Sequence, residues 1–213
     1  MVIAGNGYGD ASHAWRRALC IEHCNEGWAG WKSEMTMRDE QVSKAMSELA
    51  QQYLAIIKEK FKRYAPSLEK MIKGTLVFRG TAQKLEVKAA AQAFLLWVLV
   101  MDTTGASEHF EGTPFLPMFD PVMAEIVDVD PVQYLRWCIR ARRWLAEVRE
   151  SYIGQKPKDH PINVFFDIYS YFDKSFSYRP ERKMVLNAFE MMAREICSSS
   201  VLQEMTPLGE KGQ

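Results

Sequence analysis

The sequence predicts an all-α protein with a single helical core domain built around one buried central helix. The segment from Lys84 to Asp102 contains a run, from Ala89 to Met101, that is apolar on nearly every side. Such a helix has to be wrapped by other elements or by lipid. Because the run rises only about 20 Å and a membrane span needs about 20 apolar residues, we expect protein around it and no membrane association. Most of the remaining segments carry the apolar spacing of amphipathic helices.

The length of 213 residues allows one domain with a proper core plus arms. We expect an N-terminal arm with a short helix over residues 1–33, a helical core over 34–197 and a C-terminal arm over 198–213. Whether residues 11–35 belong to the arm or the core stays open. Residues 1–12 lack the pattern of a signal peptide, and four cysteines without framework spacing indicate a reducing compartment, hence the cytosol.

Local signals predict where the helices of the amino-terminal half begin and end. A long helix should start at a Thr36 cap and end at Pro66, and Gly105 should close the central helix. Shorter elements are also expected: a helix over 11–24, a turn over 67–73, an extended segment over 75–80 and an irregular loop over 103–120.

In the second half, acids that precede prolines predict two independent helix starts, at Asp120-Pro121 and at Asp130-Pro131. The second helix should run to about Tyr152. Further helices are expected over 162–173, entered through His160-Pro161, and over 180–197.

Charge is balanced overall but segregated along the chain. Residues 58–88 carry nine Lys or Arg against three acids, and residues 136–149 carry five Arg against one Glu. Residues 102–130 carry seven acids and no Lys or Arg, with no obvious role inside a lone domain. A neutral total can therefore combine a basic face with an acidic face.

Candidates for catalysis or metal binding are weak. His13, Cys20, His23 and Cys24 are the nearest approach to a metal cluster, but helical spacing turns His23 away from the two thiols. No Cys-His or Ser-His-Asp set has a recognisable spacing, and capping explains paired carboxylates such as Asp128 and Asp130. We therefore expect no catalytic residues, no metal, no cofactor and no enzymatic activity.

Arginines form a stronger signal on the helix that Asp130-Pro131 starts. Arg136, Arg140 and Arg143 fall on one stripe, and Trp137 and Trp144 lie beside it. Guanidinium groups next to aromatic rings suit phosphate contact and base stacking on single-stranded nucleic acid. The alternative is a solvated charged face with both tryptophans in the core. A second basic segment, which includes Lys62 and Arg63, would add to a phosphate track if both segments lined one groove.

Three stretches resemble the coat proteins of flexible filamentous plant RNA viruses of the potyvirus, potexvirus and closterovirus type. The stretch Ala93–Leu99, with its exit through residues 103–107, resembles the Trp-bearing core helix of potyvirus coats. Residues 131–137 resemble the helix that supplies the family's RNA-contacting arginine. Residues 164–169 resemble the element that carries the family's core aspartate.

The resemblance implies a helical core whose flexible arms dock on neighbouring subunits, with single-stranded RNA in a groove of each subunit. Arg136 would contact the RNA backbone and Asp167 would orient that part of the groove. Ser107, or a threonine of Thr103-Thr104, would be the polar partner. Residues 1–33 and 198–213 would be the linking arms.

The leading hypothesis is therefore a coat or nucleocapsid protein that binds single-stranded RNA and polymerises into a helical filament, located in the virion and the host cytoplasm. The expected RNA-binding residues are Arg136, Asp167, Ser107, Arg140, Arg143, Lys62 and Arg63. A second hypothesis is a helical adaptor that binds protein partners through an exposed Pro/Phe loop at residues 113–119. A third is an enzyme with an apolar helical pocket.

Overall fold

A computed structural model describes residues 28–75, 83–150, 159–173 and 183–206, and every regular element among them is a helix. The prediction of an all-α fold is therefore confirmed. The helices are α2 (Trp28–Thr75), α3 (Gln83–Gly105), α4 (Phe115–Ile126), α5 (Pro131–Glu150), α6 (Pro161–Phe172), α7 (Lys183–Ser198) and α8 (Val201–Met205). The chain divides into two compact units, residues 1–43 and 44–213. The helix expected over 11–24 and most of the extended segment expected over 75–80 lie outside the described residues, while Thr75 is the last residue of α2.

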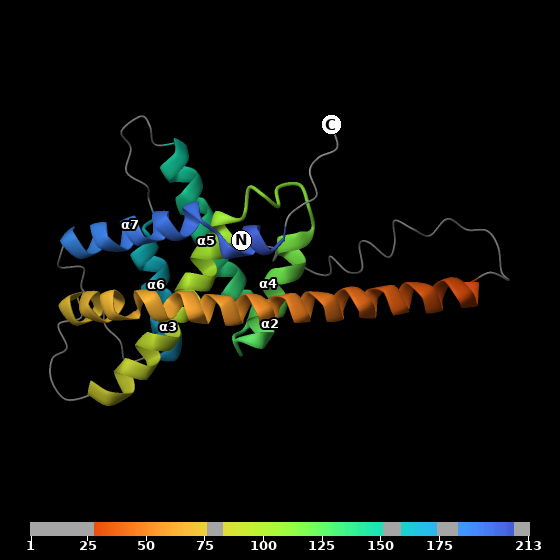
Figure 1. The fold of residues 1–213 in the computed structure, drawn as a ribbon, viewed down its shortest axis with the longest axis horizontal. Helices are drawn as coiled ribbons and strands as arrows, with labels where there is room; N and C mark the ends of the chain where they lie inside the picture. The colour runs from red at the N-terminus through yellow and green to blue at the C-terminus, as the bar shows by residue number, and fades with distance from the viewer. Residues whose placement is uncertain (1–27, 76–82, 151–158, 174–182, 207–213) are drawn as a thin grey trace, which may run out of the picture. The chain divides into compact units, whose positions relative to one another are not determined.

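The central helix is α3, as predicted, and it is buried as its composition requires. In the second unit α3 contacts α5, α6, α7 and α8, which Figure 1 shows grouped around it. Trp97 is fully buried, and its indole N–H donates to the Pro161 carbonyl at 2.9 Å. Among the described residues, no helix is sufficiently long and apolar to span a lipid bilayer.

Gly105 closes α3 where that helix meets the end of α7. A Cβ atom at Gly105 would lie 2.5 Å from the carbonyl oxygen of Cys197, far inside van der Waals contact. The thiol of Cys197 in turn donates to the Met101 carbonyl at 3.2 Å. The two helices therefore approach closely because residue 105 has no side chain.

The predicted limits of the long helix were wrong at both ends. Helix α2 begins at Trp28 rather than at a Thr36 cap, and it continues through Pro66 to Thr75, so no separate turn forms over 67–73. Proline removes the hydrogen bond to the carbonyl four residues earlier, which here belongs to Lys62. Both Lys62 and Pro66 are exposed, so water can satisfy that carbonyl and the helix can continue.

The two acid–proline pairs differ. Asp130 caps α5 as predicted: its carboxylate accepts from the Gln133 backbone N–H at 2.8 Å. The start predicted at Asp120-Pro121 was wrong, because α4 begins at Phe115 and both residues lie inside it. Asp120 is instead buried and accepts from Arg142 Nη2 at 2.7 Å. The local sequence pattern predicted that the Asp120 carboxylate would cap a helix. It instead binds Arg142, which lies 22 residues later in the sequence.

The core also extends past the predicted boundary at Cys197. Helix α8 forms over Val201–Met205, and Val201 and Leu202 are buried, so at least this part of the expected C-terminal arm belongs to the core. Ser200 caps α8, and the buried carboxylate of Asp102 accepts from the N–H groups of Val201 and Leu202 at 3.0 and 3.1 Å. A helix this short depends on such outside partners.

Candidate nucleic-acid interface

Helix α5 buries one face and exposes another, and the tryptophans lie on the buried one. Trp137 and Trp144 are both fully buried. They cannot stack on the bases of a bound strand, so the expectation of tryptophan stacking was wrong and the alternative of tryptophans in the core holds. The physical reason is that burying these large apolar rings between α5 and its neighbours removes a large hydrophobic area from water, which is favourable.

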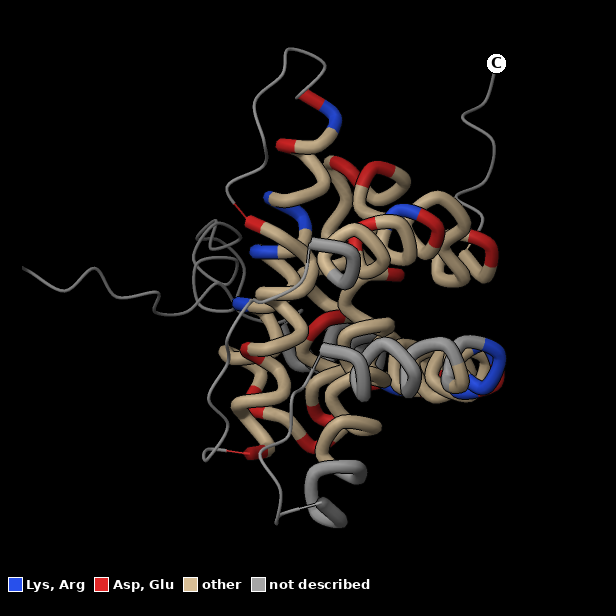
Figure 2. The backbone as a smooth tube through the Cα atoms, turned by 90° about the vertical axis from the view of Figure 1, so that its left-hand side faces the viewer, with Lys and Arg blue, Asp and Glu red and all other residues tan. Residues whose placement is uncertain are grey.

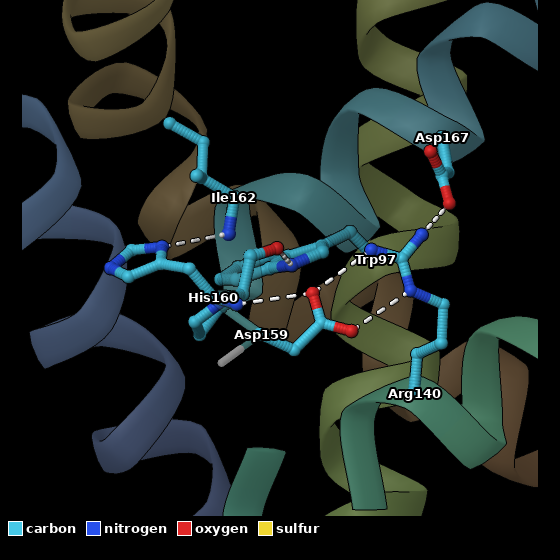
Figure 3. Close-up of polar contacts among 7 residues, drawn as sticks. Trp97, Arg140, Asp159, His160, Ile162 and Asp167 are labelled. Atoms are coloured by element: carbon cyan, nitrogen blue, oxygen red, sulfur yellow. Dashed lines mark hydrogen bonds and ion pairs between the residues drawn. The ribbon is translucent and has the colours of Figure 1, made fainter. Parts of the chain in front are cut away.

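Arg140 lies between two carboxylates that come from the approach to α6 and from α6 itself. Its Nε and Nη2 donate to the two oxygens of Asp159 at 3.0 and 2.9 Å, and its Nη1 pairs with Asp167. Figure 3 shows the guanidinium between the two acids. The side chains of Arg140 and Asp159 are largely shielded, at 29% and 16% exposure, whereas that of Asp167 is 48% exposed.

The start of α6 holds this arrangement in place. His160 caps the helix, because its Nδ1 accepts from the Ile162 N–H at 3.2 Å (Figure 3). Partial burial raises the pKa of Asp159, but the hydrogen bonds and charge of Arg140 outweigh that effect, so the net pKa is lowered. Asp159 therefore stays ionised and fixes the Arg140 fork, which in turn positions Asp167.

Asp167 pairs with Arg140 and not with Arg136, the arginine that the resemblance placed in the same part of the groove. Arg136 lies one turn earlier, is exposed, and forms no ion pair with any residue that the structure describes. Arg143 is also exposed and without an ion pair in the same part of the chain. These two guanidinium groups remain available to an external anion, while that of Arg140 is already neutralised.

A hollow opens beside Asp167 at the surface between α5 and α6. Its volume is about 730 Å³, and it is lined by Gln133, Asp167, Ser170 and Tyr171. The hydroxyl of Tyr171 accepts from the Asp130 N–H at 3.4 Å, which links the end of α6 to the cap of α5. Sequence reasoning found Asp167 but missed the other three lining residues, since no local motif marks them.

Ser107 and the two threonines form local contacts. Ser107 donates to the Thr104 carbonyl at 2.7 Å, and the hydroxyls of Thr103 and Thr104 donate to the Val100 carbonyl. The neighbour of Ser107, Glu108, pairs with Arg149, which lies nine residues or about 13 Å along α5 from Arg140. The structure therefore does not bring Ser107 to the Arg140–Asp167 pair.

The second basic segment also lies elsewhere. Lys62 and Arg63 are exposed on α2, and Lys62 pairs with Glu59 at 2.6 Å. Nearby Lys60 donates to the Ser199 carbonyl at 3.0 Å, which places this part of α2 beside the turn between α7 and α8. Figure 2 shows the basic positions of α2 and α5 on opposite sides of the bundle. The two segments do not line one groove.

The acidic segment 102–130 has roles inside the domain, contrary to expectation. Asp102 caps α8, Asp120 pairs with Arg142, and Asp130 caps α5. Burial raises the pKa of Asp120, and the charge of Arg142 opposes that shift. Only some of the seven acids in this segment are therefore available to form an acidic face at the surface.

The Pro/Phe loop is not the exposed loop that the adaptor hypothesis requires. Residues 115–119 open α4, where Leu116 and Phe119 are buried and Phe115 stacks on Phe110 with ring centroids 4.1 Å apart. Of the apolar side chains in this stretch, Met118 and the prolines at 114 and 117 are the exposed ones. The phenylalanines form part of the core.

Metal-binding groupings of His, Cys, Asp or Glu are absent from the part of the chain that the structure describes. The weak metal candidate of His13, Cys20, His23 and Cys24 lies outside that part. Cys138 and Cys197 are buried thiols, and burial raises the pKa of Cys197 to about 12, so neither is a reactive nucleophile. No family model, curated protein or solved structure matches this chain.

Proposed function

We propose that this protein binds single-stranded RNA and coats it as a helical, self-associating array, a binding rather than a catalytic role. The observation that carries the proposal is the exposed guanidinium of Arg136, which has no ion pair with the described residues and lies on α5 one helical turn from Gln133 in the lining of the hollow. Arg143 continues the same exposed face of α5. Arginines of this kind contact phosphates without reading sequence, which is what packaging any RNA requires.

The charges around Arg140 limit where a phosphate could bind. One guanidinium faces two carboxylates there, so the local charge sums to −1 and repels a polyanion. Arg140 is therefore a positioning residue for Asp167, and the phosphate contacts fall to Arg136 and Arg143. Residues 1–33 keep their proposed role as an arm that links subunits.

The test is RNA binding measured at several salt concentrations by fluorescence anisotropy with a labelled single-stranded oligonucleotide. Arg136→Ala should weaken binding and reduce the slope of log affinity against log salt by about 0.7, the value for one lost phosphate contact on a single strand. Arg63→Ala is the matched control, because it removes an exposed arginine from a different helix, α2. Salt-independent binding, or an effect of Arg63→Ala alone, would refute an RNA interface on α5.

A protein partner is the second candidate function, and the exposed aliphatic stripe of α5 favours it. Val132, Leu135 and Ile139 are 61%, 41% and 46% exposed at helical spacing. Affinity capture of a defined partner that survives nuclease treatment and is lost with Leu135→Ser would support this adaptor reading. Loss of all captured protein on nuclease treatment would favour RNA.

A further inference from the structure

The hollow between α5 and α6 has the parts of a seat for one base, beyond the phosphate contacts of the proposed function. We propose that it binds a nucleobase with an exocyclic amino group, which cytosine, adenine and guanine have and uracil lacks, from the single strand; this rests on the proposed RNA binding. The hollow of about 730 Å³ is large enough for a base and its ribose, and its lining residue Gln133 lies three residues before Arg136 on α5.

Tyr171 supplies the aromatic surface of this seat. Tyr171 is 39% exposed, and it lies against the buried Trp137. Its ring stands edge-on to Trp137, with centroids 5.6 Å apart and planes at 88°, and its hydroxyl accepts from the Asp130 N–H. These contacts fix the ring while leaving part of it open to a ligand. A held aromatic ring at the surface is what base stacking on a single strand uses.

The polar lining of the seat consists mainly of hydrogen-bond acceptors. The Oδ2 atom of Asp167 pairs with Arg140, which leaves Oδ1 to accept a hydrogen bond from a ligand. The hydroxyl of Ser170 donates its only proton to the Phe166 carbonyl at 2.7 Å, so its oxygen can accept. An acceptor-rich lining selects a ligand edge that donates. Cytosine N4, adenine N6 and guanine N2 provide two donor hydrogens each, whereas uracil offers two carbonyl acceptors and one N–H.

Gln133 completes the seat and connects it to the backbone contact. Its side-chain amide makes no hydrogen bond with the described residues, and it carries both donors and acceptors for the rest of the base edge. Gln133 and Arg136 are three residues apart on α5 and are therefore neighbours on its surface. A base in the hollow would thus carry its phosphate toward the exposed guanidinium of Arg136.

The experiment compares three 12-nucleotide strands of equal charge with the full chain at one salt concentration: oligo(C), oligo(U) and an abasic strand. Oligo(C) should bind at least about fivefold more tightly than the abasic strand, and more tightly than oligo(U). Tyr171→Leu and Gln133→Ala should each remove most of this advantage and leave abasic binding unchanged. Met191→Ala, at an exposed apolar position on α7, is the matched control.

Thermal melting of each variant checks that it folds. If Tyr171→Leu does not fold, Gln133→Ala still tests the base seat. Equal affinity for all three strands, unchanged by either variant, would overturn the base seat and leave the proposed RNA binding intact. Failure to bind any strand would overturn the proposed function and, with it, the seat.

Discussion

At the scale of single residues, His160 shows how one side chain joins the fold to the candidate site. Its Nδ1 caps α6, its Nε2 lies 3.8 Å from Glu190 Oε2 on α7, and its neighbour Asp159 holds Arg140. Burial lowers the pKa of His160, and the charges of Glu190 and Asp159 offset only part of that effect. The cap requires an unprotonated Nδ1, so the folded chain favours the neutral ring.

This predicts an acid-sensitive contribution to stability. Because the folded pKa of His160 lies below the unfolded value of about 6.5, the contribution is complete above that pH and is lost as pH falls through the folded pKa. His160→Asn retains a capping oxygen but does not titrate. Urea unfolding at pH 7.5 and 5.0 should therefore show a larger loss for the wild type than for His160→Asn. Equal losses in the two proteins would contradict the prediction.

At the scale of elements, the carboxylate of Asp102 attaches α8 to the bundle. It accepts from the Val201 and Leu202 N–H groups and from the Tyr53 hydroxyl at 3.0 Å, so one side chain of α3 joins α8 and α2. Burial raises the pKa of Asp102, while the N–H groups of Val201 and Leu202 and then the Tyr53 hydroxyl favour its charged form. A five-residue helix has no stability of its own without these partners.

Removing that carboxylate should release α8. Asp102→Ala leaves the Val201 and Leu202 N–H groups without an acceptor and the Tyr53 hydroxyl with only the Leu99 carbonyl, at 3.4 Å. The expected cost is about 2–4 kcal/mol of unfolding free energy. Amide hydrogen exchange should show lost protection over residues 201–206 while α6 stays protected. Gln203→Ala, at an exposed position on α8, is the control and should leave both unchanged. Unaltered protection of α8 in Asp102→Ala would show that packing of Leu202 suffices to hold it.

The elements that sequence reasoning predicted well are those defined by local signals. An all-apolar run marks α3, an acid before proline marks the start of α5, and His160-Pro161 marks the start of α6. The errors arise where distant contacts decide. Asp120 serves Arg142 rather than a cap, and α8 exists because Asp102, nearly one hundred residues earlier, accepts its N–H groups.

The candidate site follows the same division. The arginine stripe and Asp167 could be found from spacing and resemblance, but the choice of Arg140 over Arg136 as the partner depends on which turn of α5 faces α6. Likewise, spacing could not decide whether Trp137 and Trp144 face solvent. Gln133, Ser170 and Tyr171 become a group only when two helices pack against each other.

At the scale of the whole molecule, two exposed surfaces of opposite character lie within the second unit. The first is the exposed face of α5, on which Val132, Leu135 and Ile139 accompany Arg136 and Arg143. The second, called the acidic surface, consists of exposed acids at the two ends of α4: Glu111 before its start, and Glu125 and Asp128 at its end. If the face of one copy binds the acidic surface of the next, the contact is heterologous and the array stays open-ended, as the proposed coat requires.

Charge reversal tests the contact between the α5 face and the acidic surface. A nonspecific effect of either substitution would not be rescued by combining the two. Arg143→Glu and Glu125→Arg should each lower RNA-dependent assembly, measured by light scattering and by negative-stain microscopy of filaments, because each places like charges together across the interface. The double variant carries both reversed charges on every copy and should regain assembly, since each contact is then complementary again. Arg143 also contacts phosphate in the proposed function, so RNA affinity is measured for every variant at low protein concentration. The decisive comparison is between Arg143→Glu and the double variant, because both have lost the same phosphate contact and differ only at residue 125. A double variant that assembles no better than either single one would contradict this contact, and a wild-type chain that stays monomeric with RNA would contradict the array itself.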